Sequence, residues 1–394
     1  MNMKSEHKYM RNIKLDVISA FITNLNMQSS IWVLYLAYCG MSLAEIGILE
    51  GVYHATSILF EIPSGAVADL PGRKRSMILS RVCVAVSCFI MLFSRSFGWF
   101  ALSFMMQALG NNFNSGSEEA LVYDSMKCLG REEHYMGVYG KLNVVIEISQ
   151  GIATVLGGIL AEYSYFSCYS ACLAIGVLAL LPVSFMTEIP CGSSGKETGG
   201  VRELVVQHFK NSFKILKSDI RILNIIVYYS VIFAAETLLF FYSQQYYFEL
   251  GYNKIQISLI LLLAGGASCL GAVMSERIFR KYREKTSFVG AVVIGAALVC
   301  QGFGIPAISV LAFAAAGFCN SVLYPVQSDR LNSLIPSEQR ATLISVDSMF
   351  FSIGMILMFP LAGTLADRFG LSPVLSGIGI LVLVFTVCWN RREE

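Results

Sequence analysis

Charged residues are scarce in this chain of 394 residues, since only 14% are Asp, Glu, Lys or Arg, against about 25% in an average soluble protein. The four His are scattered without the spacing of a metal site. The eleven Cys include no C-x-x-C pair, and no P-loop for a nucleotide phosphate is present. The net charge of only +2 argues against nucleic-acid binding. We therefore expect no enzyme activity, metal, cofactor or nucleic-acid partner.

Long apolar runs take the place of charge. Hydrophobic residues make up 55% of the chain, and segments such as 17–44 and 286–328 contain no charged side chain at all. A membrane-spanning helix needs roughly 20 such residues. The sequence therefore predicts twelve spans, at 13–38, 44–69, 76–94, 99–127, 136–160, 165–187, 221–248, 254–279, 286–303, 307–334, 342–366 and 371–390.

Lys and Arg divide unequally between the two sides that twelve spans create. Of the 29 Lys and Arg residues, all but Arg95, Lys254 and Arg368 fall on the side of the N-terminus. Cytoplasmic loops of membrane proteins carry such an excess of Lys and Arg. We therefore expect a multi-pass protein of the inner or plasma membrane, with both termini in the cytoplasm. It would be a monomer surrounded by the lipid bilayer.

A tight basic turn follows the second predicted span, where residues 65–75 read GAVADLPGRKR. With the twelve spans, this turn resembles the signature loop of the major facilitator superfamily, and the chain resembles its twelve-helix bacterial drug-efflux type. The resemblance implies an all-α membrane protein whose twelve transmembrane helices form two pseudo-symmetric six-helix bundles. Its site for a small-molecule substrate would lie between the bundles.

The two halves of the chain repeat. At an offset of 205 residues, 158–162 (GILAE) aligns with 363–367 (GTLAD), and Asp124 aligns with Asp329. The longest polar interval separates the halves. We therefore expect an N-terminal six-helix bundle over 1–187 and a C-terminal one over 221–394. The cytoplasmic linker between them, 188–220, is expected to be flexible at first and then to form a helix on the membrane surface.

The resemblance also assigns the basic turn to a conformational latch. Asp69, Arg73 and the carboxylate at the inner end of the fourth span, here Asp124, would form a charge relay. Gly65 and Gly72 would allow close approach and a sharp turn. The alternative is that the basic residues serve only to set the topology. The second half would hold a looser copy of the latch, with the residues Glu276, Arg280 and Asp329.

Carboxylates inside the predicted spans are the candidates for proton coupling, because an ionised group there is costly unless it faces a wet cavity or a partner. Glu236 is the strongest, since it lies near the middle of the seventh span on a face with aromatic residues. The alternative for each is a hydrogen bond that holds two helices together. The candidates are Glu236, Glu118, Glu147 and Asp347.

Amide and aromatic side chains on the same spans outline a substrate cavity. In the first span, Asn24, Gln28 and Tyr35 are predicted to share one helical face. Packing between helices is the alternative for any single one. An apolar cavity with aromatic walls and one or two acids suits an amphipathic organic compound. The other candidates are Asn111, Asn114, Tyr229, Phe233, Phe240, Asn320, Tyr324 and Gln327.

We predict a secondary transporter that works by alternating access and exports an amphipathic organic compound or drug in exchange for protons. Drug antiporters of the family that this chain resembles tend to carry Gly-Pro where it has Ala153 and Thr154. The family's proton-coupled members often carry an Arg in the fourth span, which this chain lacks over 106–110. The export prediction therefore depends on composition and carboxylates. The alternatives are an uptake transporter for a small metabolite, and a non-transporting receptor or membrane enzyme on the same fold.

Overall fold

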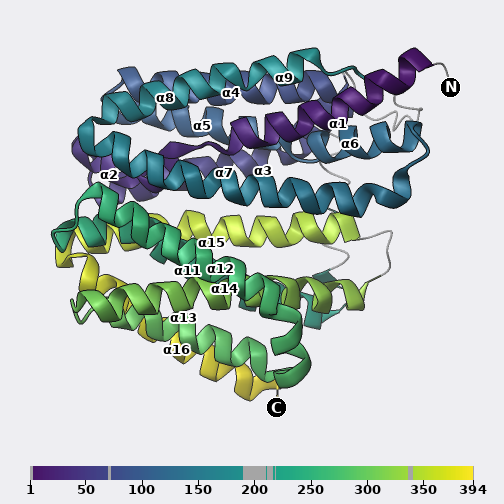
Figure 1. Cartoon of the computed structure of the whole chain (residues 1–394). Coiled ribbons are helices and arrows are strands. Elements are labelled where there is room, and N and C mark those ends of the chain that lie inside the picture. Colours follow the sequence, from purple (N-terminus) through teal and green to yellow (C-terminus); the bar gives the residue numbers. More distant parts are fainter. Residues whose placement is uncertain are drawn as a thin grey trace. The chain divides into compact units, whose positions relative to one another are not determined.

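The computed structural model describes residues 3–69, 72–189, 210, 216–217, 219–335 and 340–393, and every regular element in that part of the chain is a helix (Figure 1). The side chains of 62–69 are not described. Most of the interval 188–220 lies outside the described residues, so the linker and its surface helix stay predictions. The same holds for the side-chain role of Asp69.

Contacts group the chain into two compact units. The residues up to Ser30 and those from Ala55 through the first half form one unit, and Ile31–His54 joins the second half. The division into two six-helix bundles stays a prediction, because this grouping follows contacts and not the repeat. Helix α3 (Leu43–Asp69) contributes residues to both units.

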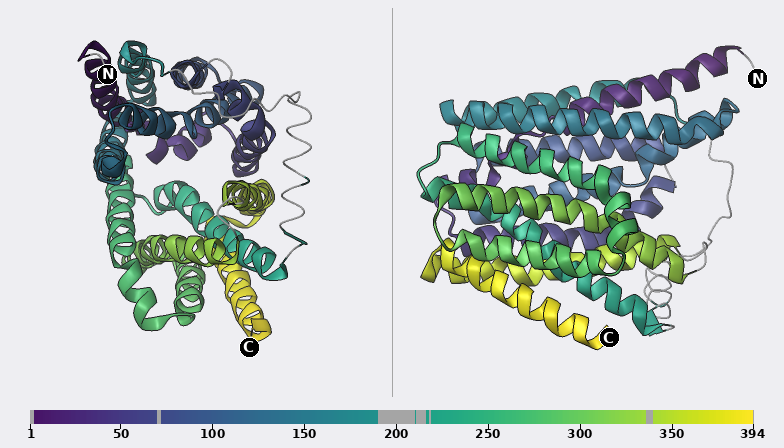
Figure 2. Two further views of the ribbon diagram at one scale, coloured as in Figure 1. Left: turned by 90° about the vertical axis from the view of Figure 1, so that its right-hand side faces the viewer. Right: turned by 60° about the horizontal axis from the view of Figure 1, so that its bottom comes forward.

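Apart from α2 and part of α3, the helices of the N-terminal half form the first unit, and its long helices run alongside one another (Figures 1 and 2). One hydrophobic cluster of this unit contains Met77, Leu121, Val183, Met186 and Ile189. The helices are α1 (Met3–Asn24), η1 (Met27–Ser30), α4 (Arg73–Phe93), α5 (Phe97–Asn114), α6 (Ser117–Cys128), η2 (Glu132–His134), α7 (Tyr135–Tyr163), α8 (Tyr165–Leu178) and α9 (Leu180–Phe185).

The second unit combines α2 with the helices of the C-terminal half. One end is packed around Ile222, Ile226, Leu331 and Val346. Helix α11 packs against α14, α15 and α16. The helices are α2 (Trp32–Tyr38), α11 (Ile220–Glu249), α12 (Lys254–Tyr282), α13 (Lys285–Gln301), α14 (Pro306–Leu334), α15 (Arg340–Phe369) and α16 (Leu371–Glu393).

Each of the twelve predicted spans corresponds to helical structure, and nine helices in the described residues are long and apolar enough to cross a membrane. Of the other three, α13 is shorter, and the first and fourth spans are interrupted. Large apolar side chains such as Leu59, Val273 and Leu381 are between 68% and 80% exposed on the helix surfaces. Such apolar surfaces suit contact with lipid. A helix also satisfies its own backbone hydrogen bonds, as a structure inside lipid must.

Local sequence explains where helices begin and break. Asn253 starts α12 with a capping box. Its side chain accepts from the backbone amide of Gln256, and the Gln256 side chain accepts from the backbone amide of Asn253. In the fourth span Gly116 has φ of +73°, a conformation open to glycine, and separates α5 from α6. The prediction of one continuous helix over 99–127 was therefore wrong, and Glu118 lies in the first turn of α6.

Candidate functional site

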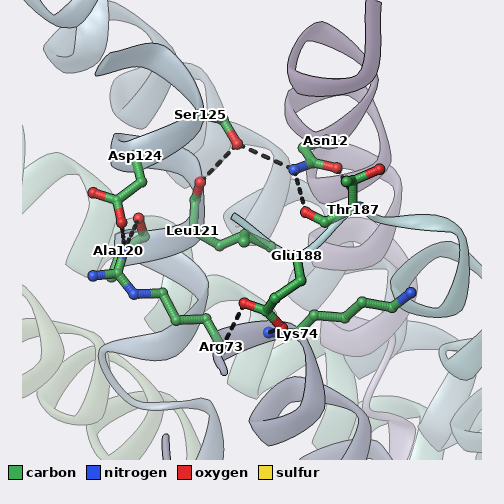
Figure 3. Close-up of polar contacts among 9 residues, drawn as sticks. All are labelled: Asn12, Arg73, Lys74, Ala120, Leu121, Asp124, Ser125, Thr187 and Glu188. Carbon is green, nitrogen blue, oxygen red and sulfur yellow. Dashed lines mark hydrogen bonds and ion pairs between the residues drawn. The ribbon is translucent and has the colours of Figure 1, made fainter. Parts of the chain in front are cut away.

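Within the basic turn, Gly72 directly precedes α4, has φ of +102° and lies against the carboxylate of Glu188. A Cβ atom at Gly72 would come within 2.6 Å of the Glu188 carboxylate. That carboxylate accepts hydrogen bonds from the backbone amides of Arg73 and Lys74, both at 3.0 Å. Glu188 therefore caps the N-terminus of α4, where a negative charge is favoured by the helix dipole (Figure 3).

Arg73 extends from this capped end to α6. Its guanidinium forms an ion pair with Asp124 and donates to the carbonyl oxygen of Ala120 (Figure 3). The Arg73 and Asp124 side chains are 21% and 23% exposed. The structure thus brings together two members of the predicted latch. Asp69 lies at the end of α3, and its side chain is outside the described residues.

The segment after α9 ties α1 and α4 to the same end of the unit. Asn12 donates to the carbonyl of Thr187 at 2.9 Å and accepts from its amide at 2.8 Å. Asn12 also donates to the hydroxyl of Ser125 in α6, as Figure 3 shows. Lys74 donates to the Ser184 carbonyl at 2.7 Å. Glu188 and Asn12 were missed at the sequence level, because their partners are distant in the chain.

The predicted second copy of the latch has a different geometry. Glu276 pairs with Arg280 one turn away on α12 at 2.6 Å, and both side chains are more than 70% exposed. Within the described residues Asp329 forms no ion pair, and its expected grouping with Arg280 stays a prediction. Its neighbour Arg330 instead pairs with Glu284, between α12 and α13. The missing Pro-Gly turn explains this difference, because α12 continues to Tyr282 and exposes its basic end.

Helix α11 carries Glu236 as predicted, and that residue is only 7% exposed. Among the described residues its carboxylate has no hydrogen-bond or ion-pair partner. Aromatic rings occupy the same helix on either side. Tyr229 shares a hydrogen bond of 2.6 Å with the Ser287 hydroxyl, and Phe233 lies 6.0 Å from the ring of Tyr324 on α14.

The other candidates of the second unit form a smaller polar group. Gln327 donates to the carboxylate of Asp347 at 2.7 Å and so joins α14 to α15. Asn320 lies on α14 with a buried side-chain oxygen that has no partner among the described residues. Phe240 is near Phe313, with ring centroids 6.1 Å apart. These contacts bring α11, α14 and α15 together without testing whether the side chains line a cavity.

The predicted face of the first span was wrong. Helix α1 ends at Asn24, a short 3-10 helix contains Gln28, and Tyr35 lies on the separate helix α2. The three residues therefore do not follow one helical repeat. Asn24 instead accepts from Gln150 of α7 at 3.2 Å. Their role in substrate binding stays a prediction.

The remaining candidates of the first unit differ in burial. Glu147 on α7 and Asn111 on α5 are exposed. Asn114 donates to the Glu118 carboxylate at 2.6 Å across the break between α5 and α6. The same Glu118 oxygen is 3.6 Å from the guanidinium of Arg81, which is 2% exposed on α4. In the sequence Arg81 is one of the basic residues on the predicted cytoplasmic side, but the structure buries it.

Two further contacts of the second unit were not predicted. Asp367 accepts from the amides of Leu43 and Ala44, both at 2.9 Å, and so caps α3 from the end of α15. Nearby, the Tyr242 hydroxyl lies between the carbonyl oxygens of Leu43 and Phe359, at 3.2 and 3.1 Å. The sequence signal was the GTLAD repeat itself, whose last residue is Asp367.

A buried pair of a histidine and a glutamate lies farther along α3. The His54 ring is 3.5 Å from the Glu50 carboxylate and 3.1 Å from the hydroxyl of Ser352 on α15. Both His54 and Glu50 are 7% exposed. In the part of the chain that the structure describes, no three His, Cys, Asp or Glu side chains are arranged to hold a metal.

Comparison with known proteins places these contacts in context. The sequence matches the Major Facilitator Superfamily over residues 17–308 and 283–394. It is 23% identical to the uncharacterized MFS-type transporter YxaM of Bacillus subtilis, over 90% of this chain and 89% of that protein. It is 21% identical to the quinolone resistance protein NorA of Staphylococcus aureus (strain MRSA252), over 88% of this chain and 87% of NorA.

A solved structure shares the fold. The crystal structure of the nucleoside transporter NupG superposes with a TM-score of 0.75, at 14% sequence identity, and the alignment covers 100% of both chains. At that identity the likeness concerns the helical fold and carries nothing about the compound transported.

Proposed function

The chain belongs to the Major Facilitator Superfamily, and we propose that it exports an amphipathic organic compound in exchange for protons. It is a multi-pass integral membrane protein and a secondary transporter, not an enzyme. Direction, coupling ion and class of compound are the proposed part. We also propose that both termini are cytoplasmic, as the distribution of Lys and Arg predicts.

The observation that carries the proposal is the burial of Glu236. Its carboxylate is inside a transmembrane helix, 7% exposed and without an ion-pair partner in the described residues. An ionised carboxylate in such a place costs roughly 3 kcal/mol. Glu236 would therefore be neutral when it faces the apolar interior, and charged when it meets water or a cation. A group of this kind can exchange a proton for a cationic substrate.

The neighbours of Glu236 favour an amphipathic compound over a sugar. Tyr229, Phe233 and Phe240 lie on the same helix. The ring of Tyr229 is near that of Phe233, and the rings of Phe233 and Phe240 are each near an aromatic ring of α14. Aromatic faces attract organic cations and flat apolar groups. The staphylococcal relatives are named for quinolone resistance, at about 22% identity, which favours an organic compound as the substrate class.

We further propose that the capped end of α4 acts as part of an inner latch. Arg73 joins α4 to Asp124, and Glu188 holds the first turn of α4 to the segment after α9. A packed set of this kind is bistable, so breaking it in one state and remaking it in another changes which side is open. Alternating access in this superfamily would use such a change.

The experiment measures flux in liposomes that contain the purified full chain. Ethidium, a flat organic cation, serves as the probe, and its movement is followed with and without an imposed proton gradient. The proposal expects gradient-driven ethidium movement in the wild type and its loss in Glu236→Gln. Glu249→Gln is the matched control, because Glu249 is an exposed carboxylate at the end of the same helix.

Each other outcome has a meaning. Gradient-driven movement that Glu236→Gln leaves unchanged would remove Glu236 from the mechanism. Movement of ethidium with the proton flow instead of against it would favour uptake. Saturable ethidium binding without any flux would favour the receptor alternative.

A further inference from the structure

Three ionisable side chains meet inside the first unit. Asp16 on α1 is 1% exposed, Arg81 on α4 is 2% exposed, and Glu118 lies in the first turn of α6. Arg81 lies 3.6 Å from Glu118, and it also donates at 3.4 Å to Ser19, which lies about one turn from Asp16 on α1. The group therefore holds two acids and one base, contributed by three different helices.

The hydrogen bonds in this group are divided unequally. Glu118 accepts from Asn114 at 2.6 Å in addition to its contact with Arg81. Within the described residues, neither carboxylate oxygen of Asp16 has a hydrogen-bond partner. The Nε atom of Arg81 is also buried without one. The weak bonds of Arg81 to Ser19 and Ser80, both 3.4 Å, leave its guanidinium only partly satisfied.

Burial and charge together determine what Asp16 must carry. A buried ionised carboxylate with no hydrogen bonds is strongly disfavoured, because the lost hydration is not replaced. Among the described residues, the cation that faces Asp16 is Arg81, and it already pairs with Glu118. A metal cation at Asp16 would be repelled by the same guanidinium. A proton satisfies the carboxyl group without adding a second cation.

We propose that Asp16, Arg81 and Glu118 form one proton-binding site, in which Asp16 holds the proton while Arg81 pairs with Glu118. When the proton leaves, Asp16 becomes the second acceptor for Arg81. The unpartnered Nε of Arg81 and the two unpartnered oxygens of Asp16 provide the new contact. The site holds one proton because its two acids share one base.

Other titratable groups near Asp16 do not replace this role. On α7, Tyr135 lies close enough to Asp16 for the two groups to interact. Its phenol remains neutral near pH 7, so it adds no charge to the site. On α4 and α6 the facing groups are Arg81 and Glu118 themselves. On its own helix the neighbouring polar residues are Asn12 and Ser19, which do not titrate.

The position of the site links it to the proposed latch. Helix α4 carries both Arg81 and Arg73, and α6 carries both Glu118 and Asp124. A turn of Arg81 from Glu118 to Asp16 would thus change the contact between the two helices that Arg73 and Asp124 also join. The use of the bound proton for transport rests on the proposed function, whereas the binding of the proton does not.

The test is an infrared titration of the purified full chain in detergent, without substrate or gradient. The C=O stretching band of protonated carboxyl groups is followed as a function of pH. The wild type should show a band that is absent in Asp16→Asn and present in Glu133→Gln, the control at an exposed carboxylate. A titration identical in wild type and Asp16→Asn would overturn the proposal.

A second variant keeps the test decisive if Asp16→Asn fails to fold. In Glu118→Gln, Arg81 loses its charged partner and becomes available to ionised Asp16. The Asp16 band should then disappear at a proton concentration at least tenfold higher, about one pH unit lower, than in the wild type. An unchanged midpoint would contradict the sharing of Arg81. The midpoint is also measured with K⁺ replaced by Na⁺ at constant ionic strength. A midpoint that shifts on this replacement would identify a metal-ion site and also overturn the proposal.

These results separate the site from the proposed function. An Asp16 band with proton-independent ethidium flux would retain the proton site and reject proton-coupled export. Proton-driven flux without an Asp16 band would retain export and reject this site.

Discussion

Replacement of Gly363 by Ala should loosen the contact between the N-terminus of α3 and α15. A Cβ atom at Gly363 would lie 2.1 Å from the carbonyl oxygen of Leu43, 2.5 Å from its carbonyl carbon and 2.7 Å from the Tyr242 hydroxyl. Two of these atoms belong to the backbone and cannot rotate away. Because carbon atoms pack at about 3.5–4.0 Å, the two helices must separate locally by about 1 Å or more.

The energetic consequence follows from the contacts that this separation strains. Overpacking costs about 1–3 kcal/mol. The Tyr242 hydroxyl bonds and the bonds from Leu43 and Ala44 to Asp367 lengthen at the same time. Ala gains about 1 kcal/mol of helix propensity over Gly, which offsets part of the loss. We expect the local contact to weaken by about 1–3 kcal/mol, or roughly 5- to 150-fold in the closed-to-open ratio.

Hydrogen–deuterium exchange checks this expectation at the affected amides. In Gly363→Ala, peptides that cover Leu43 and Ala44 should exchange about 5- to 150-fold faster than in the wild type. Gly377→Ala is the matched control, because a Cβ atom at Gly377 on α16 meets nothing within 4 Å. Equal protection in Gly363→Ala and Gly377→Ala would refute the close-contact reasoning.

Two further predictions concern the capped end of α4. Glu188→Gln removes the negative charge at the helix N-terminus and should cost about 0.3–1 kcal/mol, whereas Glu188→Ala also removes both hydrogen bonds and should cost about 1.5–3 kcal/mol. The apparent melting temperature at one scan rate ranks the two, and equal values would contradict the cap. Asp124→Asn should cost about 1 kcal/mol, since the Arg73 pair is only partly buried, and should slow ethidium flux in liposomes. A wild-type flux would show that the pair is not part of the latch.

Much of the helical fold was predictable from local patterns. An apolar run of about 20 residues must form a helix in lipid, because its backbone groups have no other partners. All twelve predicted spans therefore contain helices in the structure. The errors occurred where a run contains glycine or polar residues, as at Gly116 and in the break between Asn24 and Trp32. Hydropathy averages over such breaks and does not register them.

The candidate site was predictable in part. Pairing of Arg73 with Asp124 followed from the family resemblance, and the burial of Glu236 followed from its place in a span. The roles of Glu188 and Asp16 did not follow from any local pattern. Glu188 is 115 residues from Arg73, whose amide it accepts from, and its position in the sequence suggests only a loop.

Composition, apolar runs and the distribution of Lys and Arg were sufficient for the class of protein and the expected orientation, because lipid acts on every span separately. The pairing of charges depended on the packing of helices. Arg81 looked like one more cytoplasmic charge in a basic segment. Only the packing of α1, α4 and α6 buries it between two acids and leaves Asp16 without a hydrogen-bond partner among the described residues. Such an arrangement combines side chains distant in sequence, so no local periodicity contains it.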